Sequence, residues 1–272
     1  MNEGKKISLK IFKETLNELE GKKGVSEILF RDLWLEKARS TSALTKNGWY
    51  TPPPDGIAIL FGSDEDVERI NFDSLRKKEN WPSEKEIDWE RGLLFAYSSF
   101  VDVKTGILGD FDITLYFGKD ERVINHFRLC HKATREVIDE LRLINSSKSL
   151  FETSQKIFSK YGLRNSVISV SDSVSLDLGH SVPMINPLDI QDRILSSELI
   201  EKIRSERKFI NNHSDWLLNG EEQFTIEPQF LSIENDELPQ VCLHYLVKKK
   251  KDGGLIISNE NDELLREYGL LD

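Results

Sequence analysis

The chain has 272 residues, of which 38% are hydrophobic and 31% are charged, enough for one large globular domain or two small ones. Its 47 acidic and 37 basic side chains give a net charge of -10. We do not expect nucleic acid or anionic membranes as general partners of such a chain, because both are held by basic surface.

Membrane and disulfide signals are weak. No stretch reaches the roughly 18 apolar residues of a membrane span, and no apolar run follows Met1 as it would in a signal peptide. Cys130 and Cys242 are too few for a disulfide framework and are not spaced as a metal knuckle. We therefore expect two reduced, partly buried thiols in a cytoplasmic protein.

The first part of the chain predicts two helices and then strands. Apolar residues recur at helical spacing over 5–20, and Ser26 is placed to cap a second helix. Three prolines make 49–56 irregular, and 57–61 (IAILF) has the composition of a buried strand. The polar stretch 63–90 carries no regular period.

The later part alternates helices with strands. No linker rich in Pro, Gly or Ser divides the chain, so we expect an α+β fold in a single domain, 1–272. The segments expected are helices at 122–143, 150–161, 189–209 and 258–268, an alternating stretch at 167–182, strands at 224–231 and 241–247, and a turn at 252–254 leading to a strand at 255–257.

The most informative stretch is 93–118 (LLFAYSSFVDVKTGILGDFDITLYFG), which predicts a β-hairpin. Two apolar runs flank a turn that ends at Gly106, where glycine can supply a positive φ. Asp110 and Asp112 lie on one face of the second strand, because side chains alternate along a strand. Buried acids require a cation or hydrogen bonds, and the alternative is a solvated edge face.

Three short motifs follow one another along the chain, namely GDFDIT at 109–114, LGH at 178–180 and TIEP at 225–228. In this order, with helices between them, they resemble the pita-bread metallohydrolases, the family of methionine aminopeptidase, aminopeptidase P, prolidase and creatinase. The resemblance covers most of the chain and implies a curved antiparallel central sheet covered by helices. The chain has the size of that family's catalytic domain alone.

The resemblance also implies a metal site. Oxygen ligands combined with imidazole suit Mn, Co, Fe or Zn, and such ions acidify a water and polarise an amide carbonyl. The metal ligands carried over by position are Asp110, Asp112, His180, Glu227 and His244. Each of these positions also has a structural alternative: a buried structural histidine at 180, a salt-bridged acid at 227 and an ordinary strand residue at 244. Of the two hairpin acids, only one can occupy the position of the family's second aspartate.

Two ligand positions depart from the family pattern. Counting back from the turn, the residue that faces Asp110 is about Ser99, where the family has its first aspartate. Asp102 lies nearer the turn and would need a bulge to reach the site. His244 stands where the last bridging glutamate belongs, and imidazole does not bridge two ions as a carboxylate does. One ion, or none, is therefore as consistent with the sequence as two.

The family's two catalytic histidines are also missing, so the catalytic residues stay unknown. No histidine occurs between Pro52 and Val101, where Asp73 or Arg76 falls near the expected place. No His-Glu pair follows His180 before residue 194. Substrate orientation and proton transfer therefore lack their usual carriers.

Two functions fit these observations. The first is a divergent metal-dependent hydrolase that acts on a peptide, amide or C–N bond. The second is a catalytically inactive pita-bread protein that binds a small molecule, a peptide or a protein partner. The sequence leaves open whether the chain forms a homodimer.

Overall fold

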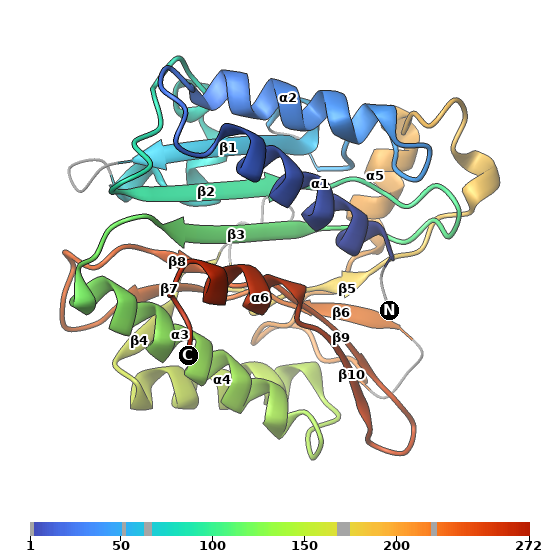
Figure 1. The fold of residues 1–272 in the computed structure, drawn as a ribbon. Helices are drawn as coiled ribbons and strands as arrows, with labels where there is room; N and C mark the ends of the chain where they lie inside the picture. Colours follow the sequence, from blue (N-terminus) through green and yellow to red (C-terminus); the bar gives the residue numbers. More distant parts are fainter. Residues whose placement is uncertain (1–2, 51–52, 63–66, 168–174, 219–221) are drawn as a thin grey trace. The chain divides into compact units, whose positions relative to one another are not determined.

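The computed structural model describes residues 3–50, 53–62, 67–167, 175–218 and 222–272 (Figure 1). The chain divides into two compact units. The N-terminal unit comprises Asn2–Gly118 and Met184–Arg204, and the C-terminal unit comprises Lys119–Pro183 and Ser205–Asp272. A single domain over 1–272 stays a prediction.

The N-terminal unit contains a three-stranded antiparallel sheet with the order β1-β2-β3. Every residue of the three strands is buried, so both faces of the sheet are covered. Tyr97 pairs with Asp112 in the register of the hairpin. The strands are β1 (Ile57–Gly62), β2 (Leu93–Ser98) and β3 (Phe111–Tyr116).

The hairpin turn explains the place of the third acid in this stretch. Beyond β2 and β3 the pairing continues, since Val101 bridges Leu108, and Ser99 therefore falls opposite Asp110 as predicted. Asp102 accepts hydrogen bonds from the backbone N–H groups of residues 104 and 105 at 2.8 and 2.9 Å. Its carboxylate thus caps the turn.

Two helices cover the sheet, and Figure 1 shows both along one side of it. Ser26 caps α2 as predicted, because its Oγ accepts from the backbone N–H of residue 29 at 3.2 Å. Phe12 packs against Trp34 and Phe111 at ring-centroid distances of 5.0 and 5.4 Å. Each such buried ring contributes about 1.5–3 kcal/mol. The helices are α1 (Glu3–Leu19) and α2 (Glu27–Ser40).

The C-terminal unit contains two further antiparallel sheets, with the orders β10-β9-β6-β5 and β4-β7-β8. All described strand pairings are antiparallel, so the α+β prediction is confirmed, with the pairing divided among three sheets. The helices are α3 (Glu121–Glu140), α4 (Ser147–Lys160) and α6 (Glu260–Glu267); the strands are β4 (Leu163–Asn165), β5 (Ser181–Val182), β6 (Gln223–Ile226), β7 (Gln229–Ser232), β8 (Val241–Cys242), β9 (Tyr245–Lys249) and β10 (Leu255–Ser258).

The helix predicted over 189–209 is wrong at both ends, since α5 spans only Ser197–Glu206. Asp192 and Arg193 have φ values of 50° and 62°, which a right-handed helix cannot contain. The Arg193 guanidinium donates to the backbone carbonyls of residues 39, 41 and 44, so tertiary hydrogen bonds override the local periodicity. Phe209 instead forms a β-bridge with His180.

Residues 168–174 of the alternating stretch lie outside the described residues, and its end forms β5. Where they are described, the stretches 49–56 and 63–90 contain no α-helix, and they carry short 3₁₀ turns at Pro54–Gly56, Val67–Arg69, Asp73–Arg76 and Lys78–Asn80. Residues 51–52 and 63–66 lie outside the described part. Within the described ranges, no helix combines the length and apolar composition needed to cross a membrane.

Candidate active site

The two hairpin acids lie in the N-terminal unit and are both buried, Asp110 with 4% and Asp112 with 7% of its surface exposed. The solvated-face alternative is therefore wrong. The indole N–H of Trp49 donates to Oδ1 of Asp110 over 2.5 Å. A carboxylate taken out of water gains most from such a donor.

Asp112 holds a proton more readily than an exposed acid does. Burial raises the pKa of its carboxyl to about 7, although the positive charge of Lys5 lowers that pKa and the negative charge of Asp110 raises it. Lys5 lies on α1 and is itself fully buried. The unit thus keeps two acids and one ammonium group in a water-poor environment.

Ser99, in place of the family's first aspartate, serves the packing of the loops beside it. Its hydroxyl accepts from the backbone N–H of Tyr50 and donates to the carbonyl of Gly56, both at 3.2 Å. A Cβ on Gly48 or Gly56 would lie 2.3 or 2.4 Å from that hydroxyl oxygen. Glycine at both positions is what lets the two backbone segments close around the serine.

In the C-terminal unit, three of the predicted ligands come together. Glu227 Oε1 lies 3.5 Å from Nε2 of His180, and Glu227 Oε2 lies 3.4 Å from Nε2 of His244. The two histidines have side chains 6% and 1% exposed, against 18% for the glutamate. The carboxylate therefore stands between two buried imidazoles and remains the more accessible group.

Local backbone packing holds His180 beside Thr225, two residues before Glu227. The backbone N–H of His180 donates to the hydroxyl of Thr225 at 2.8 Å, and a Cβ on Gly179 would lie 2.1 Å from the Thr225 carbonyl oxygen. Glycine is thus required before His180. Pro228 cannot donate a backbone hydrogen bond, and Glu227 falls in the gap between β6 and β7.

The tautomer of His180 is fixed by a neighbouring carbonyl. Its Nδ1 lies 2.7 Å from the Ser181 carbonyl oxygen, so Nδ1 carries the proton and donates, and Nε2 presents a lone pair toward Glu227. Burial and, to a smaller extent, the positive charge of Arg207 together lower the pKa of His180 to about 3. A neutral Nε2 and a carboxylate therefore face each other in the presence of the positive charge of Arg207.

The fit of these residues to a metal ion is partial. Among the residues that the structure describes, no group of three or more His, Cys, Asp or Glu side chains is arranged to hold an ion. The donor chemistry nevertheless fits, because a carbonyl-bound Nδ1 with Nε2 pointing outward is the usual state of a metal-binding histidine. Two ligands bonded to one tetrahedral ion lie about 3.4 Å apart, close to the separations around Glu227.

The residues near the expected catalytic histidine pair with each other. Both lie in a short 3₁₀ turn (Asp73–Arg76), and Nη2 of Arg76 is 3.1 Å from Oδ1 of Asp73. Burial raises the pKa of Asp73, and the charge of Arg76 opposes the rise. Neither side chain supplies the imidazole that the family would have.

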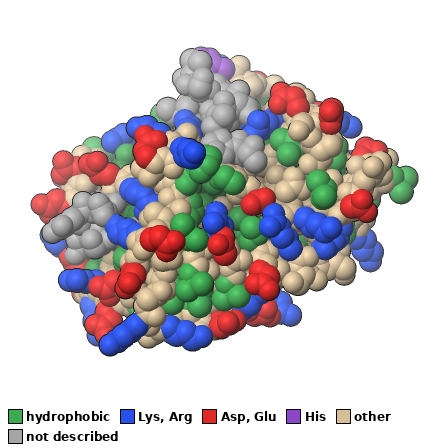
Figure 2. Space-filling model, turned by 90° about the horizontal axis from the view of Figure 1, so that it is seen from above, with side chains coloured by type: hydrophobic (Ala, Val, Ile, Leu, Met, Phe, Trp, Pro, Cys, Tyr) green, Lys and Arg blue, Asp and Glu red, His purple; other side chains and the backbone are tan. Residues whose placement is uncertain are grey.

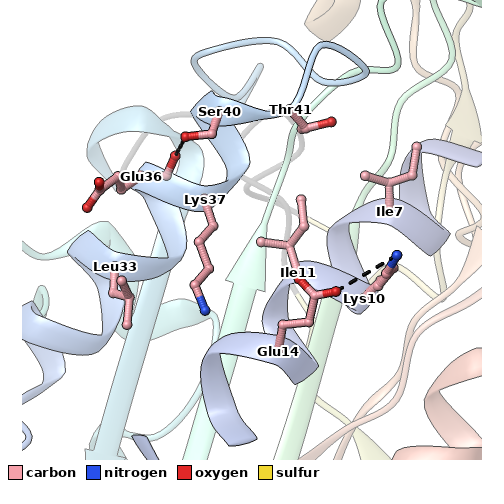
Figure 3. Close-up of a pocket in the computed structure, with 9 residues that line it drawn as sticks. All are labelled: Ile7, Lys10, Ile11, Glu14, Leu33, Glu36, Lys37, Ser40 and Thr41. Atoms are coloured by element: carbon pink, nitrogen blue, oxygen red, sulfur yellow. Dashed lines mark hydrogen bonds and ion pairs between the residues drawn. The ribbon is translucent and has the colours of Figure 1, made fainter. Parts of the chain in front are cut away.

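A groove between α1 and α2 is lined by ion-paired and aliphatic side chains (Figure 3). It encloses about 620 Å³, and Lys10 and Glu14 form an exposed 3.8 Å ion pair on one wall. Its lining contains no histidine and none of the predicted ligands. The face seen in Figure 2 likewise carries acidic and basic side chains interspersed with one another. Neither the groove nor this face therefore offers a better candidate active site than the hairpin acids or the His180, Glu227 and His244 cluster.

Sequence reasoning missed two residues that act on the hairpin acids. Lys5 could have been noticed, because it precedes Phe12 by seven residues and so lies on the apolar face of the predicted helix. Trp49 gives no such signal, since its bond to Asp110 spans 61 residues.

By sequence, no protein-family model matches the chain, and no curated protein matches it significantly. By structure, a prolidase from Thermococcus sibiricus aligns at 15% identity and TM-score 0.60, over 94% of this chain and 56% of that one. The X-Pro aminopeptidase from Thermotoga maritima aligns at 14% identity and TM-score 0.60, over 93% and 57%. A methionine aminopeptidase from Rickettsia prowazekii aligns at 15% identity and TM-score 0.53, over 91% and 92%.

The chain spans little more than half the length of the prolidase and the X-Pro aminopeptidase, and almost the whole of the methionine aminopeptidase. At these identities the likeness concerns the fold. The resemblance inferred from the three motifs is confirmed at that level, and the chain has the pita-bread fold of the prolidases and aminopeptidases.

Proposed function

We propose that this chain is a divergent metal-dependent hydrolase of the aminopeptidase and creatinase type, which cleaves a peptide, an amide or another C–N bond. The observation that supports it most is the Glu227 carboxylate held between the Nε2 atoms of His180 and His244. The structural neighbours are prolidases and aminopeptidases by name, which supports a peptide-like substrate.

The proposed ligands of a single Mn, Co, Fe or Zn ion in the C-terminal unit are His180, Glu227 and His244. Asp110 and Asp112, in the N-terminal unit, stay predicted ligands. A divalent ion lowers the pKa of a bound water and polarises an amide carbonyl. His180 has a pKa of about 3 and presents a lone pair at Nε2, so near neutral pH it acts as a ligand and not as a general acid.

A second candidate is a catalytically inactive protein that uses the same fold to bind a small molecule, a peptide or a protein partner. Ser99 favours it, because a serine engaged with Tyr50 and Gly56 replaces the acid that would help to bridge two ions. For both candidates we propose a cytoplasmic location, because the buried cysteines Cys130 and Cys242 are free thiols, as is usual in a reducing compartment. Both candidates are compatible with a monomer or a homodimer.

Metal analysis of protein purified without chelator tests the first candidate. We expect about one bound Mn, Co, Fe or Zn per chain in wild type and little in Glu227→Ala, with normal content in Glu234→Ala, which removes an exposed glutamate of the same unit. An ion at about 100 times its dissociation constant stabilises the native state by roughly 2.7 kcal/mol, so the melting temperature should rise by several degrees.

If no metal co-purifies and none of the four ions raises the melting temperature of wild type, the hydrolase proposal fails. Equal metal content in wild type and Glu227→Ala would show that the ion binds elsewhere. Either result leaves the binding protein as the remaining candidate.

A further inference from the structure

A second hollow, in the C-terminal unit, encloses about 580 Å³. That volume lies within the range of small-molecule sites. None of its lining residues belongs to the His180, Glu227 and His244 cluster. Its wall is formed by one face of α3 and the end of the chain, with Arg128, Leu129, His131, Lys132, Arg135 and Leu271 among the lining residues.

The α3 wall is basic although the chain as a whole is acidic, with a net charge of -10. Arg128, Lys132 and Arg135 are spaced by four and three residues, so they follow one stripe of the helix. Like charges at this spacing destabilise a helix by a few tenths of a kcal/mol per pair. An anion within the hollow would relieve that repulsion.

A buried acid, Asp262, contacts the His131 ring and orients it. Nε2 of His131 lies 3.4 Å from Oδ2 of Asp262, whose side chain is 4% exposed, and the Tyr245 hydroxyl donates to Oδ1 of Asp262 at 2.6 Å. Burial alone would raise the pKa of Asp262, but the contacts with His131 and Tyr245 and the charge of Arg135 outweigh it and lower the pKa. An ionised acid that is held on both oxygens fixes the ring on the wall of the hollow.

A carboxylate of the chain itself already lies against this wall. Oδ1 of Asp272 is 3.0 Å from Nε of Arg128, and the Asp272 side chain is 90% exposed. Such an exposed ion pair contributes at most about 1 kcal/mol, so a competing anion can displace it. Arg128 also donates to the side-chain oxygen of Asn125 at 3.2 Å and lies 4.0 Å from Glu121.

Apolar surface adjoins the charged wall. Leu129 is 42% exposed, and Leu271, which is only 7% exposed, also lines the hollow. A ligand that carries only a charged group would leave this surface in contact with water, whereas a short hydrocarbon chain would cover it. The lining therefore combines a place for an oxyanion with a place for an apolar group.

We propose that this hollow binds a small organic oxyanion with an apolar tail, whose charged group is held by Arg128 and Arg135 beside the His131 ring and whose tail covers Leu129. The carboxylate and phosphate forms of such a ligand share this chemistry. The site is independent of the proposed hydrolase activity.

The test uses three probes with the same hydrocarbon chain and different head groups, namely hexanoate, hexyl phosphate and hexan-1-ol, titrated into the full chain by calorimetry. We expect saturable binding of at least one anion, about tenfold or more tighter than hexan-1-ol, and the tighter anion identifies the head group. Arg128→Gln and Arg135→Gln should each weaken that binding about tenfold. Arg122→Gln, on the same helix but outside the hollow, should leave it unchanged.

The positioning of His131 is tested with Tyr245→Phe, which removes a hydrogen bond to Asp262 and leaves the basic wall intact. We expect a loss of several-fold in anion affinity and none in hexan-1-ol affinity. The proposal is overturned if the alcohol binds as tightly as the anions, or if Arg122→Gln weakens binding as much as Arg128→Gln. Variants at 128 and 135 that change the melting temperature while no probe binds would also overturn it, because the stripe would then serve stability alone.

Discussion

Trp49 donates its indole N–H to Oδ1 of Asp110 over 2.5 Å, although 61 residues separate the two along the chain. Both residues are buried, so the bond forms where a carboxylate has lost most of its water. The indole thereby fixes the orientation of an acid that the sequence predicts as a metal ligand.

Trp49→Phe should destabilise the protein more than a loss of ring volume explains. A hydrogen bond to a carboxylate contributes about 1.5–3 kcal/mol, and the acid left behind is buried. Trp34→Phe is the matched control, because Trp34 is fully buried and its indole N–H makes no hydrogen bond within the described residues. Urea unfolding measures both. Equal losses for the two variants would mean that the bond to Asp110 adds nothing.

Glu27 is a fully buried acid at the start of α2 that ties three segments together. It forms a bidentate ion pair with Arg69, whose two terminal nitrogens donate to its two carboxylate oxygens at 2.6 and 2.8 Å. It also accepts from the backbone N–H of Phe61 at 2.6 Å and from the backbone and hydroxyl of Ser83 at 2.9 and 3.0 Å. Five donors compensate the burial of its charge.

We expect Glu27→Gln to cost about 3–5 kcal/mol of unfolding free energy, because an amide replaces one acceptor oxygen with donors and leaves the Arg69 charge without its partner. Glu14→Gln is the control, since Glu14 forms an exposed 3.8 Å pair with Lys10 (Figure 3) and should cost under about 0.5 kcal/mol. Denaturant unfolding compares them. A loss below 1 kcal/mol at position 27 would show that the network contributes little.

Regular and short-range features could be predicted from the sequence. The turn glycine Gly106 and the alternating strands fixed the register in which Ser99 faces Asp110. Ser26 identified the start of α2. Such features follow from local backbone preference and from the need to bury one face.

Features that depend on one distant partner could not be predicted. Nothing near Glu27 in the sequence indicates Arg69, and nothing near Trp49 indicates Asp110. The early part of the expected 189–209 helix failed for the same reason, since Arg193 hydrogen-bonds to carbonyls about 150 residues away. Side chains of this kind are selected by three-dimensional fit, which leaves no periodic trace.

Stability should respond to pH through Asp112. Its folded pKa of about 7 lies above the ordinary value of 3.8, so between these two pH values the folded state holds a proton that the unfolded state lacks. Protonation of Asp112 therefore contributes its full amount to the free energy of unfolding below about pH 4, and this contribution is lost as the pH rises to about 7. Over roughly three pH units this amounts to at most about 4 kcal/mol.

Asp112→Asn removes this titration and keeps the shape of the side chain. Its stability relative to wild type should rise between pH 4 and pH 8, as measured by urea unfolding with a chelator present. His180 has a folded pKa of about 3, so it lowers stability as the pH falls below 6.5. This effect is the same in wild type and Asp112→Asn, so it cancels in the difference between their unfolding free energies. A difference between the two proteins that does not change with pH would exclude a raised pKa at Asp112.

Ser99→Asp tests whether the missing acid can be restored by one substitution. The Ser99 hydroxyl fits between Gly48 and Gly56 and donates to the Gly56 carbonyl at 3.2 Å. A carboxylate is larger and has no proton to donate there, so we expect a loss of about 1–3 kcal/mol in stability.

The same variant should remain a poor peptidase. Wild type and Ser99→Asp should both turn over Met-Xaa and Xaa-Pro peptides well below about 1 per second with added Mn or Co, because the family's two catalytic histidines are absent from both. Ser99→Ala separates the two effects, since it removes the hydroxyl without adding bulk and should cost only about 1 kcal/mol. Peptide hydrolysis and urea unfolding are measured on all three proteins. A large gain in turnover with unchanged stability in Ser99→Asp would show that the serine alone keeps an otherwise complete site inactive.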